Sequence, residues 1–134
     1  MKKVNKSDTE WKDMLSESVY NVTRKKGTEA PFSGALNKNI EIGTYHCACC
    51  DNVLFESTHK FDSGTGWPSF YEVASNMSLY FKTDTSLGMS RVEALCMVCD
   101  AHLGHIFDDG PKPTGKRYCI NSVSLKFNKK DTWW

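Results

Sequence analysis

Apolar residues recur at helical spacing near the start of the chain. They are Trp11, Met14 and Leu15, and the last two follow the first at steps of three and four residues. Ser7 and Glu10, just before them, form the sequence pattern of a capping box, in which each side chain satisfies a backbone N–H of the first helical turn. The pattern therefore predicts a short helix over about residues 7–17.

From Ile42 onward, short apolar or aromatic runs alternate with residues that favour turns. The runs are IGTYHCACC, VLFES, SFYEV, MSLYFKTD, MSRVEALCMVC, HLGHIF and RYCINSVSLKF. Several short strands separated by turn signals are typical of an antiparallel, mostly β domain. The stretches 24–37 and 107–116, which carry glycines and prolines, predict loops. We therefore expect a mainly β fold, with residues 1–134 forming one domain.

The last apolar run, RYCINSVSLKF, places a lone cysteine within a predicted strand. Because the side chains of a strand alternate between its two faces, Arg117, Cys119 and Asn121 share one face, which sets a cation and an amide beside the thiol. Farther along the run, the apolar positions change faces. Either both faces of this strand are partly buried or the strand carries a bulge.

The formal net charge of +1 bears on the kinds of partner that the chain can attract. A nearly balanced chain produces no broad positive field, so neither nucleic acid nor an acidic membrane surface is an expected partner. No apolar stretch approaches the length that spans a bilayer, and no apolar run follows the N-terminal lysines, as a secretory signal requires. We therefore expect a cytoplasmic protein in a reducing setting, where cysteines serve metal binding or catalysis more often than disulfides.

The cysteines are unevenly distributed. Three of the six crowd into one tetrapeptide and two into another, and this spacing disfavours a framework of three disulfides. Each tetrapeptide is a C-x-x-C turn, which presents two thiolates to one metal ion, and two turns complete a tetrahedral site. We therefore predict a structural zinc site with four cysteine ligands, with two redox-active pairs or an iron site as the alternatives. The predicted ligands are Cys47, Cys50, Cys96 and Cys99.

Two cysteines remain outside this ligand set. Cys49 lies inside the first turn, either as a spare thiol or as a second redox cysteine. Cys119 is a candidate nucleophile, because a nearby cation such as Arg117 and a protonated histidine can lower a thiol pKa and raise the thiolate fraction. His102 and His105 are candidates for proton transfer near neutral pH. The alternatives are a buried Cys119 that acts as a small hydrophobe and a structural role for His102.

The segment SGTGWPSF combines two glycines with a tryptophan and a proline. Glycine permits positive φ angles and close backbone approach, and Pro68 restricts Trp67 to extended geometry. The indole of Trp67 is either a wall for a small apolar group or an ordinary core side chain. The alternative to an enzyme is therefore a non-catalytic, zinc-stabilised β module that binds a small ligand or a peptide near Trp67.

Together these motifs resemble those of a known enzyme family. The two C-x-x-C turns, EAPFSGALN, SGTGWPSF and the block that ends in HLGHIFDDGPKPTGKRYCINSVSLKF are similar, in order, to the methionine-R-sulfoxide reductases of the B type, over about residues 8–128. The resemblance implies two antiparallel sheets, short N-terminal helices and a zinc site with four cysteine ligands. It also implies thiol-dependent reduction of methionine-R-sulfoxide in proteins to methionine.

The resemblance further implies roles for individual residues. Cys119 matches the catalytic cysteine of the family, which becomes a sulfenic acid when it attacks the sulfoxide. His105 is the candidate proton donor, and His102 and Asn121 orient the polar end of the substrate. Three further residues match the family's substrate pocket: Trp67, Arg117 and Asp109.

The chain departs from the common family pattern at Thr65, where many members have a resolving cysteine between the two glycines. Threonine forms no disulfide, so the sulfenic acid of Cys119 must be reduced in another way. Either thioredoxin or another thiol reduces it directly, or Cys49 attacks it, which requires Cα atoms within about 6 Å of each other. We expect direct reduction, because Cys49 lies in a rigid metal turn. The expected partners are oxidised proteins and the thiol reductant, and we expect the chain to act as a monomer.

Overall fold

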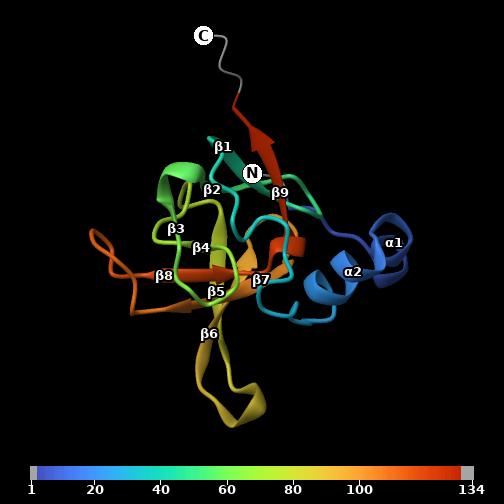
Figure 1. The fold of residues 1–134 in the computed structure, drawn as a ribbon. Coiled ribbons are helices and arrows are strands. Elements are labelled where there is room, and N and C mark those ends of the chain that lie inside the picture. The colour runs from blue at the N-terminus through green and yellow to red at the C-terminus, as the bar shows by residue number, and fades with distance from the viewer. Residues whose placement is uncertain (1–2, 131–134) are drawn as a thin grey trace.

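The computed structural model describes residues 3–130, which form two antiparallel β-sheets and two short helices (Figure 1). The smaller sheet has the strand order β2-β1-β9, with the strands Gly43–Cys47 (β1), Val53–Glu56 (β2) and Leu125–Lys129 (β9). The larger sheet has the order β3-β4-β8-β7-β6-β5. Its strands are Lys60–Phe61 (β3), Ser69–Phe70 (β4), Leu79–Asp84 (β5), Arg91–Cys96 (β6), His102–Phe107 (β7) and Arg117–Ile120 (β8). The predicted mainly β fold is confirmed.

The N-terminal segment contains two helices where the apolar spacing predicted one. The capping box at Ser7 is present, but the first helix, Asp8–Met14 (α1), ends before Leu15, whose backbone is extended. Ser16 then caps a second helix, Glu17–Thr23 (α2), by accepting a hydrogen bond from the backbone N–H of Val19. The helix predicted over about residues 7–17 is therefore present but shorter, because a second cap starts another helix, and the short N-terminal helices that the resemblance implied are confirmed.

Both predicted loops are present, with small differences in their bounds. Residues 24–42 contain neither a helix nor a strand and connect α2 to β1. The second loop begins one residue later than predicted, because Phe107 is the last residue of β7. Within it, the backbone N–H of Gly110 donates to the carbonyl of Gly115, so the loop folds back to β8.

The run RYCINSVSLKF does not form one strand. Strand β8 ends at Ile120, a 3₁₀ turn covers Ser122–Ser124 (η3), and β9 then joins the smaller sheet. The hydroxyl of Ser122 accepts a hydrogen bond from the backbone N–H of Leu36, and that of Ser124 donates one to the carbonyl of His102. Both buried hydroxyls in the turn therefore have hydrogen-bond partners. The change of apolar face that the sequence showed is the point where the chain passes from one sheet to the other.

Aromatic side chains from both sheets meet in the core. Phe55 of β2 stacks on Phe70 of β4 with ring centroids 4.2 Å apart, and Tyr45 of β1 meets Phe70 edge-on at 5.0 Å. All three side chains are fully buried. Aromatic pairs contribute about 0.5–1.5 kcal/mol each beyond the burial of their area. These contacts hold the smaller sheet against β4, the strand that neighbours β8.

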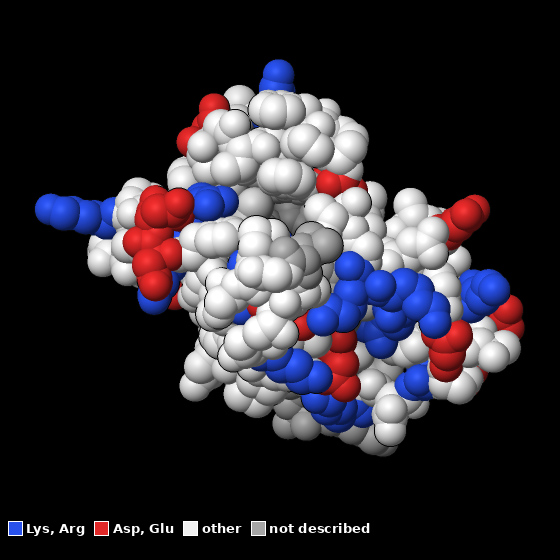
Figure 2. All heavy atoms as spheres, turned by 90° about the horizontal axis from the view of Figure 1, so that it is seen from below, with Lys and Arg blue, Asp and Glu red and all other residues white. Residues whose placement is uncertain are grey.

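Figure 1 shows the smaller sheet above the larger one, the helices to one side, and the hairpin of β5 and β6 projecting from the lower end. On the face seen from that end, Lys and Arg side chains lie next to Asp and Glu side chains (Figure 2). Within residues 3–130, no helix has the length and apolar character needed to cross a bilayer.

Candidate functional site

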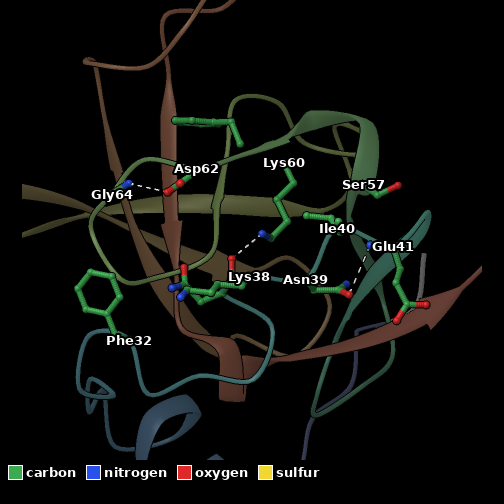
Figure 3. Close-up of a pocket in the computed structure, with 11 residues that line it drawn as sticks. Phe32, Lys38, Asn39, Ile40, Glu41, Ser57, Lys60, Asp62 and Gly64 are labelled. Atoms are coloured by element: carbon green, nitrogen blue, oxygen red, sulfur yellow. Dashed lines mark hydrogen bonds between the residues drawn. The ribbon is translucent and has the colours of Figure 1, made fainter.

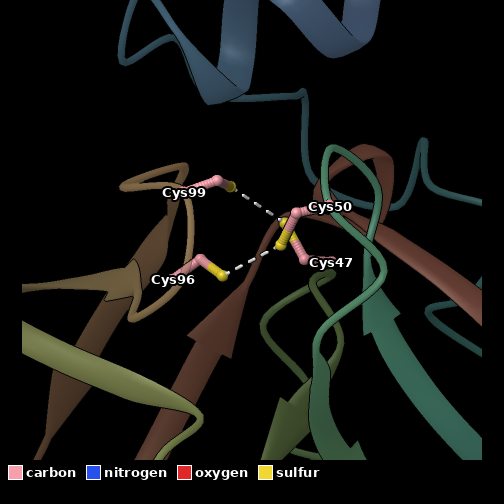
Figure 4. A group of neighbouring side chains, drawn as sticks. All are labelled: Cys47, Cys50, Cys96 and Cys99. Atoms are coloured by element: carbon pink, nitrogen blue, oxygen red, sulfur yellow. Dashed lines mark hydrogen bonds between the residues drawn. The ribbon is translucent and has the colours of Figure 1, made fainter. Parts of the chain in front are cut away.

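Four cysteine sulfurs gather where the two sheets meet (Figure 4). All four Sγ atoms lie within 4.8 Å of one another, and the pairs Cys47–Cys99 and Cys50–Cys96 are each separated by 3.6 Å. Neighbouring ligands of a tetrahedral ion with metal–sulfur bonds of about 2.3 Å lie about 3.8 Å apart. The four thiols therefore fit one metal ion. The six cysteines, which all lie within residues 3–130, are free in the structure.

The two C-x-x-C turns have the same local geometry. Cys47 ends β1 and Cys96 ends β6, and each carbonyl accepts a hydrogen bond of 2.9 Å from the N–H four residues later, on Asp51 and Asp100. These two aspartates have φ angles of 70° and 65°, in the left-handed region that lets each turn reverse and that Asp tolerates well. Each sheet thus contributes one turn to the cysteine cluster.

Arg24, which caps the C-terminus of α2, links the helices to this cluster. Its guanidinium donates to the carbonyl of Cys99 at 2.9 Å and to its sulfur at 3.2 Å, and it lies over the ring of Trp11 at 4.1 Å. A cation that donates to a ligand sulfur stabilises the thiolate that a metal requires. No sequence motif at Arg24 indicates this contact.

Cys49 is buried in the first turn but is not one of the clustered ligands. It lines a groove between the helices and β9, together with Met14, Val19 and Val123. This groove shares no lining residue with the cavity at Cys119 described below. The structure thus does not bring Cys49 into the surroundings of Cys119.

Cys119 lies on β8, with β4 on one side and β7 on the other. Its Cα pairs with that of Ser69 on β4 and that of His105 on β7. A cavity of about 100 Å³ opens beside it, and the lining residues are Thr28, Trp67, Arg91, Gly104, His105, Phe107, Cys119 and Asn121. Four of the predicted site residues, from three separate motifs, therefore surround one small cavity.

The thiol of Cys119 is partly buried, and burial raises its pKa above the ordinary value. The hydroxyl of Thr65, 3.9 Å from Sγ, and the guanidinium of Arg117 act in the opposite direction, because both favour the thiolate. Burial outweighs them, so the lowered pKa that a nearby cation suggested is not found. At neutral pH this thiol is mostly protonated.

Trp67 and Asn121 are held by the same segment of the loop 24–42. The indole N–H of Trp67 donates to the carbonyl of Glu29 at 3.0 Å, and the backbone N–H of Glu29 donates to Oδ1 of Asn121 at 3.0 Å. The amide of Asn121 also donates to the carbonyl of Leu103 on β7. Trp67 is therefore a fixed wall of the cavity and not an ordinary core side chain.

Arg117 and Asp109 form an ion pair at the end of β8. The guanidinium donates to both carboxylate oxygens, at 2.8 and 3.2 Å, and stacks over the ring of Phe107 at 4.3 Å. This pairing lowers the pKa of Asp109. Because Arg117 is two residues from Cys119 and on the same strand face, the pair fixes a positive charge beside the thiol.

Two carboxylates that the sequence analysis did not identify face the two histidines. Nδ1 of His102 lies 2.7 Å from Glu93, and Nε2 of His105 lies 2.7 Å from Asp84. Burial lowers the pKa of His102 in spite of Glu93, so a neutral His102 donates its Nδ1–H to that carboxylate. A glutamate inside the apolar run RVEALC was the available signal, since a charge there needs a partner.

The histidines differ in their access to the cavity. A shift of register between β6 and β7 places both rings on one face, with centroids 5.5 Å apart. His105 lines the cavity, whereas His102 is 2% exposed and is not one of the lining residues. His105 is therefore the histidine that can meet a bound molecule.

A wider groove of about 490 Å³ begins at Gly64, in the loop that carries Trp67 (Figure 3). The exposed ring of Phe32 lies at one end of it, and the backbone N–H of Phe32 donates to the carbonyl of Gly66 at 2.7 Å. On the same loop, Asp62 accepts from the N–H of Gly64 at 2.9 Å. These bonds hold the loop from outside, which keeps Trp67 in place at the cavity.

Comparisons with known proteins match nearly the whole chain. A family model described as the SelR domain matches residues 15–129. A protein of Methanosarcina barkeri (strain Fusaro / DSM 804) named peptide methionine sulfoxide reductase MsrB is 57% identical over 130 residues, which is 97% of this chain and 92% of the relative. Proteins of the same name from Pseudomonas putida (strain W619) and Leptospira interrogans serogroup Icterohaemorrhagiae serovar Lai (strain 56601) are each 55% identical, over 98% and 95% of this chain and 98% and 97% of the relatives.

The resemblance that the motifs suggested is therefore confirmed by similarity along the chain and not only within the motifs. With a family model that matches most of its residues, and with relatives of this identity over nearly its full length, the chain belongs to the MsrB family of peptide methionine sulfoxide reductases.

Proposed function

We propose that this protein reduces methionine-R-sulfoxide in proteins to methionine, with Cys119 as the nucleophile. Besides family membership, one observation carries the proposal: the sulfur of Cys119 lies at a small cavity shared with an imidazole and an indole. A cavity of about 100 Å³ suits the end of one side chain, not a folded partner. The non-catalytic binding module has no observation in its favour.

The reaction needs a thiolate and a proton. The Cys119 thiolate attacks the sulfoxide sulfur, and His105 gives a proton to the sulfoxide oxygen as it gains negative charge. The S–O bond of the substrate breaks, methionine leaves, and the hydroxyl remains on Cys119 as a sulfenic acid. Burial raises the pKa of the resting thiol. Thr65 and Arg117 act against burial and stabilise the thiolate when it forms.

The remaining cavity residues bind and orient the substrate. Trp67 packs against the S-methyl group, since its indole is a rigid apolar wall tied to Glu29. Asn121 lines the cavity and orients the polar end of the substrate. His102 helps to orient it through its contact with the ring of His105. Arg117, locked to Asp109, keeps the positive charge at the site.

The metal at the cysteine cluster is zinc in this proposal. The support is the donor set: four thiolates at tetrahedral spacing suit zinc, and a site with four protein ligands is closed to substrate. Such an ion supplies no chemistry to the reaction and acts by holding the turns of the two sheets together. Cys47, Cys50, Cys96 and Cys99 are its ligands.

The sulfenic acid is then reduced by thioredoxin or another thiol. Thr65 occupies the position next to Cys119 where a resolving cysteine would act, and Cys49 lines a separate groove. Direct reduction is therefore favoured over a Cys49–Cys119 disulfide. The protein acts as a monomer on oxidised proteins, in a reducing compartment such as the cytoplasm, which agrees with its six free cysteines.

A turnover assay on separated R and S epimers of methionine sulfoxide in a peptide, with dithiothreitol as reductant, tests the function. We expect reduction of the R epimer alone, and no turnover by Cys119→Ser with its metal content and fold unchanged. Equal turnover by Cys119→Ser would contradict the proposed nucleophile. Binding of the peptide without any turnover by the wild type would instead identify a binding module.

A further inference from the structure

A row of charged side chains extends from the cavity toward the tip of the β5–β6 hairpin. Asp84 is the last residue of β5, and its Cα pairs with that of Arg91, the first residue of β6. Its Oδ2 lies 2.7 Å from Nε2 of His105 and 3.5 Å from the guanidinium of Arg91. Its other oxygen, Oδ1, accepts from the backbone N–H of Ser86 at 3.0 Å. This carboxylate is therefore held on three sides.

Asp84 keeps its negative charge although it is only 6% exposed. The hydrogen bond from His105, followed by those from Ser86, lowers the pKa of its carboxyl group. A carboxylate accepts hydrogen bonds and cannot donate one, so Nε2 of His105 carries a proton in this contact. The nitrogen left for a bound molecule is Nδ1.

We propose that Asp84 is a positioning residue that holds the Nε2–H of His105, so that Nδ1 is the nitrogen that protonates the substrate. This inference rests on the proposed function, because it assigns a partner to the proton donor of that reaction. The carboxylate of Asp84 accepts the Nε2–H at 2.7 Å, so a proton that His105 gives to the substrate comes from Nδ1. The guanidinium of Arg91, which lines the same cavity, lies 3.5 Å from the same carboxylate oxygen.

The proton balance follows from this geometry. The imidazolium gives its Nδ1 proton to the sulfoxide oxygen, and the resulting hydroxyl stays on Cys119 when methionine leaves. His105 is left neutral with its proton on Nε2, still donated to the ionised Asp84. Solvent restores the Nδ1 proton before the next turnover, so neither oxidant nor further reductant is needed for this step.

Among residues 3–130, no second carboxylate forms a hydrogen bond with His105. Glu93, the register partner of His105, is held by His102 at 2.7 Å and by Lys26 at 3.2 Å. The titratable and charged groups that face His105 come from four strands. They are Asp84 on β5, Arg91 and Glu93 on β6, His102 on β7, and Cys119 on β8. Asp84 is the negative group with direct contact to the ring.

The variant Asp84→Asn tests the inference, because the amide oxygen can still accept from the N–H of Ser86, while the NH2 group replaces the Oδ2 that accepts from His105. In the metal-loaded full-length protein, we expect kcat on an R-sulfoxide peptide to fall by about tenfold or more, with KM changed less than twofold. Because Nε2 loses the acceptor that fixes its proton, the pH profile of kcat/KM should also differ from that of the wild type. In a His105→Asn background, Asp84→Asn should have no further effect.

Asp108→Asn is the matched control. Asp108 is an exposed carboxylate beside β7 that pairs with Lys116, and this variant should keep the wild-type profile. If Asp84→Asn also kept the wild-type profile, the inference would be overturned. Nitrogen-15 NMR of histidine-labelled wild-type protein gives a second readout that needs neither a stable variant nor turnover. A protonated Nε2 on His105 supports the inference, and an unprotonated Nε2 refutes it even if the proposed reduction itself fails.

Discussion

Substitution of one clustered cysteine should threaten the fold itself. Cys96→Ala removes one of the four cysteines whose sulfurs lie within 4.8 Å of one another. The intact cluster ties the turn at Cys50 to the turn at Cys96, 46 residues later, and so connects the two sheets. A cross-link that closes a loop of this length stabilises a protein by about 4 kcal/mol through the entropy of the unfolded chain.

This entropic value is a lower bound for an intact metal site. Zinc binding to thiolate sites in small peptides supplies about 10–16 kcal/mol at pH 7, whereas whole domains are stable by about 5–15 kcal/mol. At about 4 °C per kcal/mol for a chain of this size, the lower bound alone predicts a fall in Tm of about 15 °C. The full binding energy predicts a Cys96→Ala protein that is unfolded or insoluble at about 25 °C.

Circular dichroism melting and metal analysis of the same samples test this prediction. Cys49→Ala is the matched control, because Cys49 is buried in the same kind of turn but is not a member of the cluster. We expect this control to keep its metal and to lose only a few degrees of Tm. A soluble Cys96→Ala protein with no metal, wild-type Tm and full activity would show that the cluster does not hold the fold together.

Three further predictions use single substitutions. Thr65→Cys should form a disulfide with Cys119 after one turnover, because the Thr65 hydroxyl already lies 3.9 Å from that sulfur; peptide mapping that finds two free thiols instead would count against it. Arg24→Gln should weaken retention of the metal against a chelator by about 10–100-fold, since it removes a donor to a ligand sulfur, and unchanged retention would exclude that role. Because burial lowers the pKa of His102, the unfolded state binds more protons than the folded state at low pH. The free energy of unfolding should therefore fall as the pH drops below about 6.5, by up to about 1.4 kcal/mol per pH unit. His102→Gln should flatten this slope in urea titrations from about pH 7.5 to about pH 5, and equal slopes in both proteins would refute the assignment.

Local chemistry made the cysteine cluster and the cavity predictable. The C-x-x-C spacing indicates the cysteines of the cluster, because two thiols in one such turn can bind the same ion, and this local geometry does not depend on the rest of the fold. Cys119 and Asn121 were likewise placed on one face by the alternation of a strand, and Trp67 was singled out by its glycines and proline.

Contacts between distant strands were not predictable in the same way. Asp84 reaches His105 through the register of β5, β6 and β7, and register depends on the packing of the whole sheet. Arg24 reaches Cys99 because it caps a second helix, α2. The apolar spacing predicted one helix in this part of the chain and so gave no sign of that contact. The raised pKa of Cys119 depends on burial, so the charged neighbour alone indicated the wrong direction.

The short distances in the cysteine cluster carry a vulnerability that a bound ion removes. Two pairs of sulfurs, 3.6 Å apart, need to approach by only about 1.5 Å to reach the length of a disulfide bond. A protein that repairs oxidised side chains works where oxidants are present, so its empty cluster would be a target of the damage it reverses. With metal in place, all four sulfurs are occupied, and oxidation is left to the two thiols outside the cluster, Cys119 at the cavity and the buried Cys49.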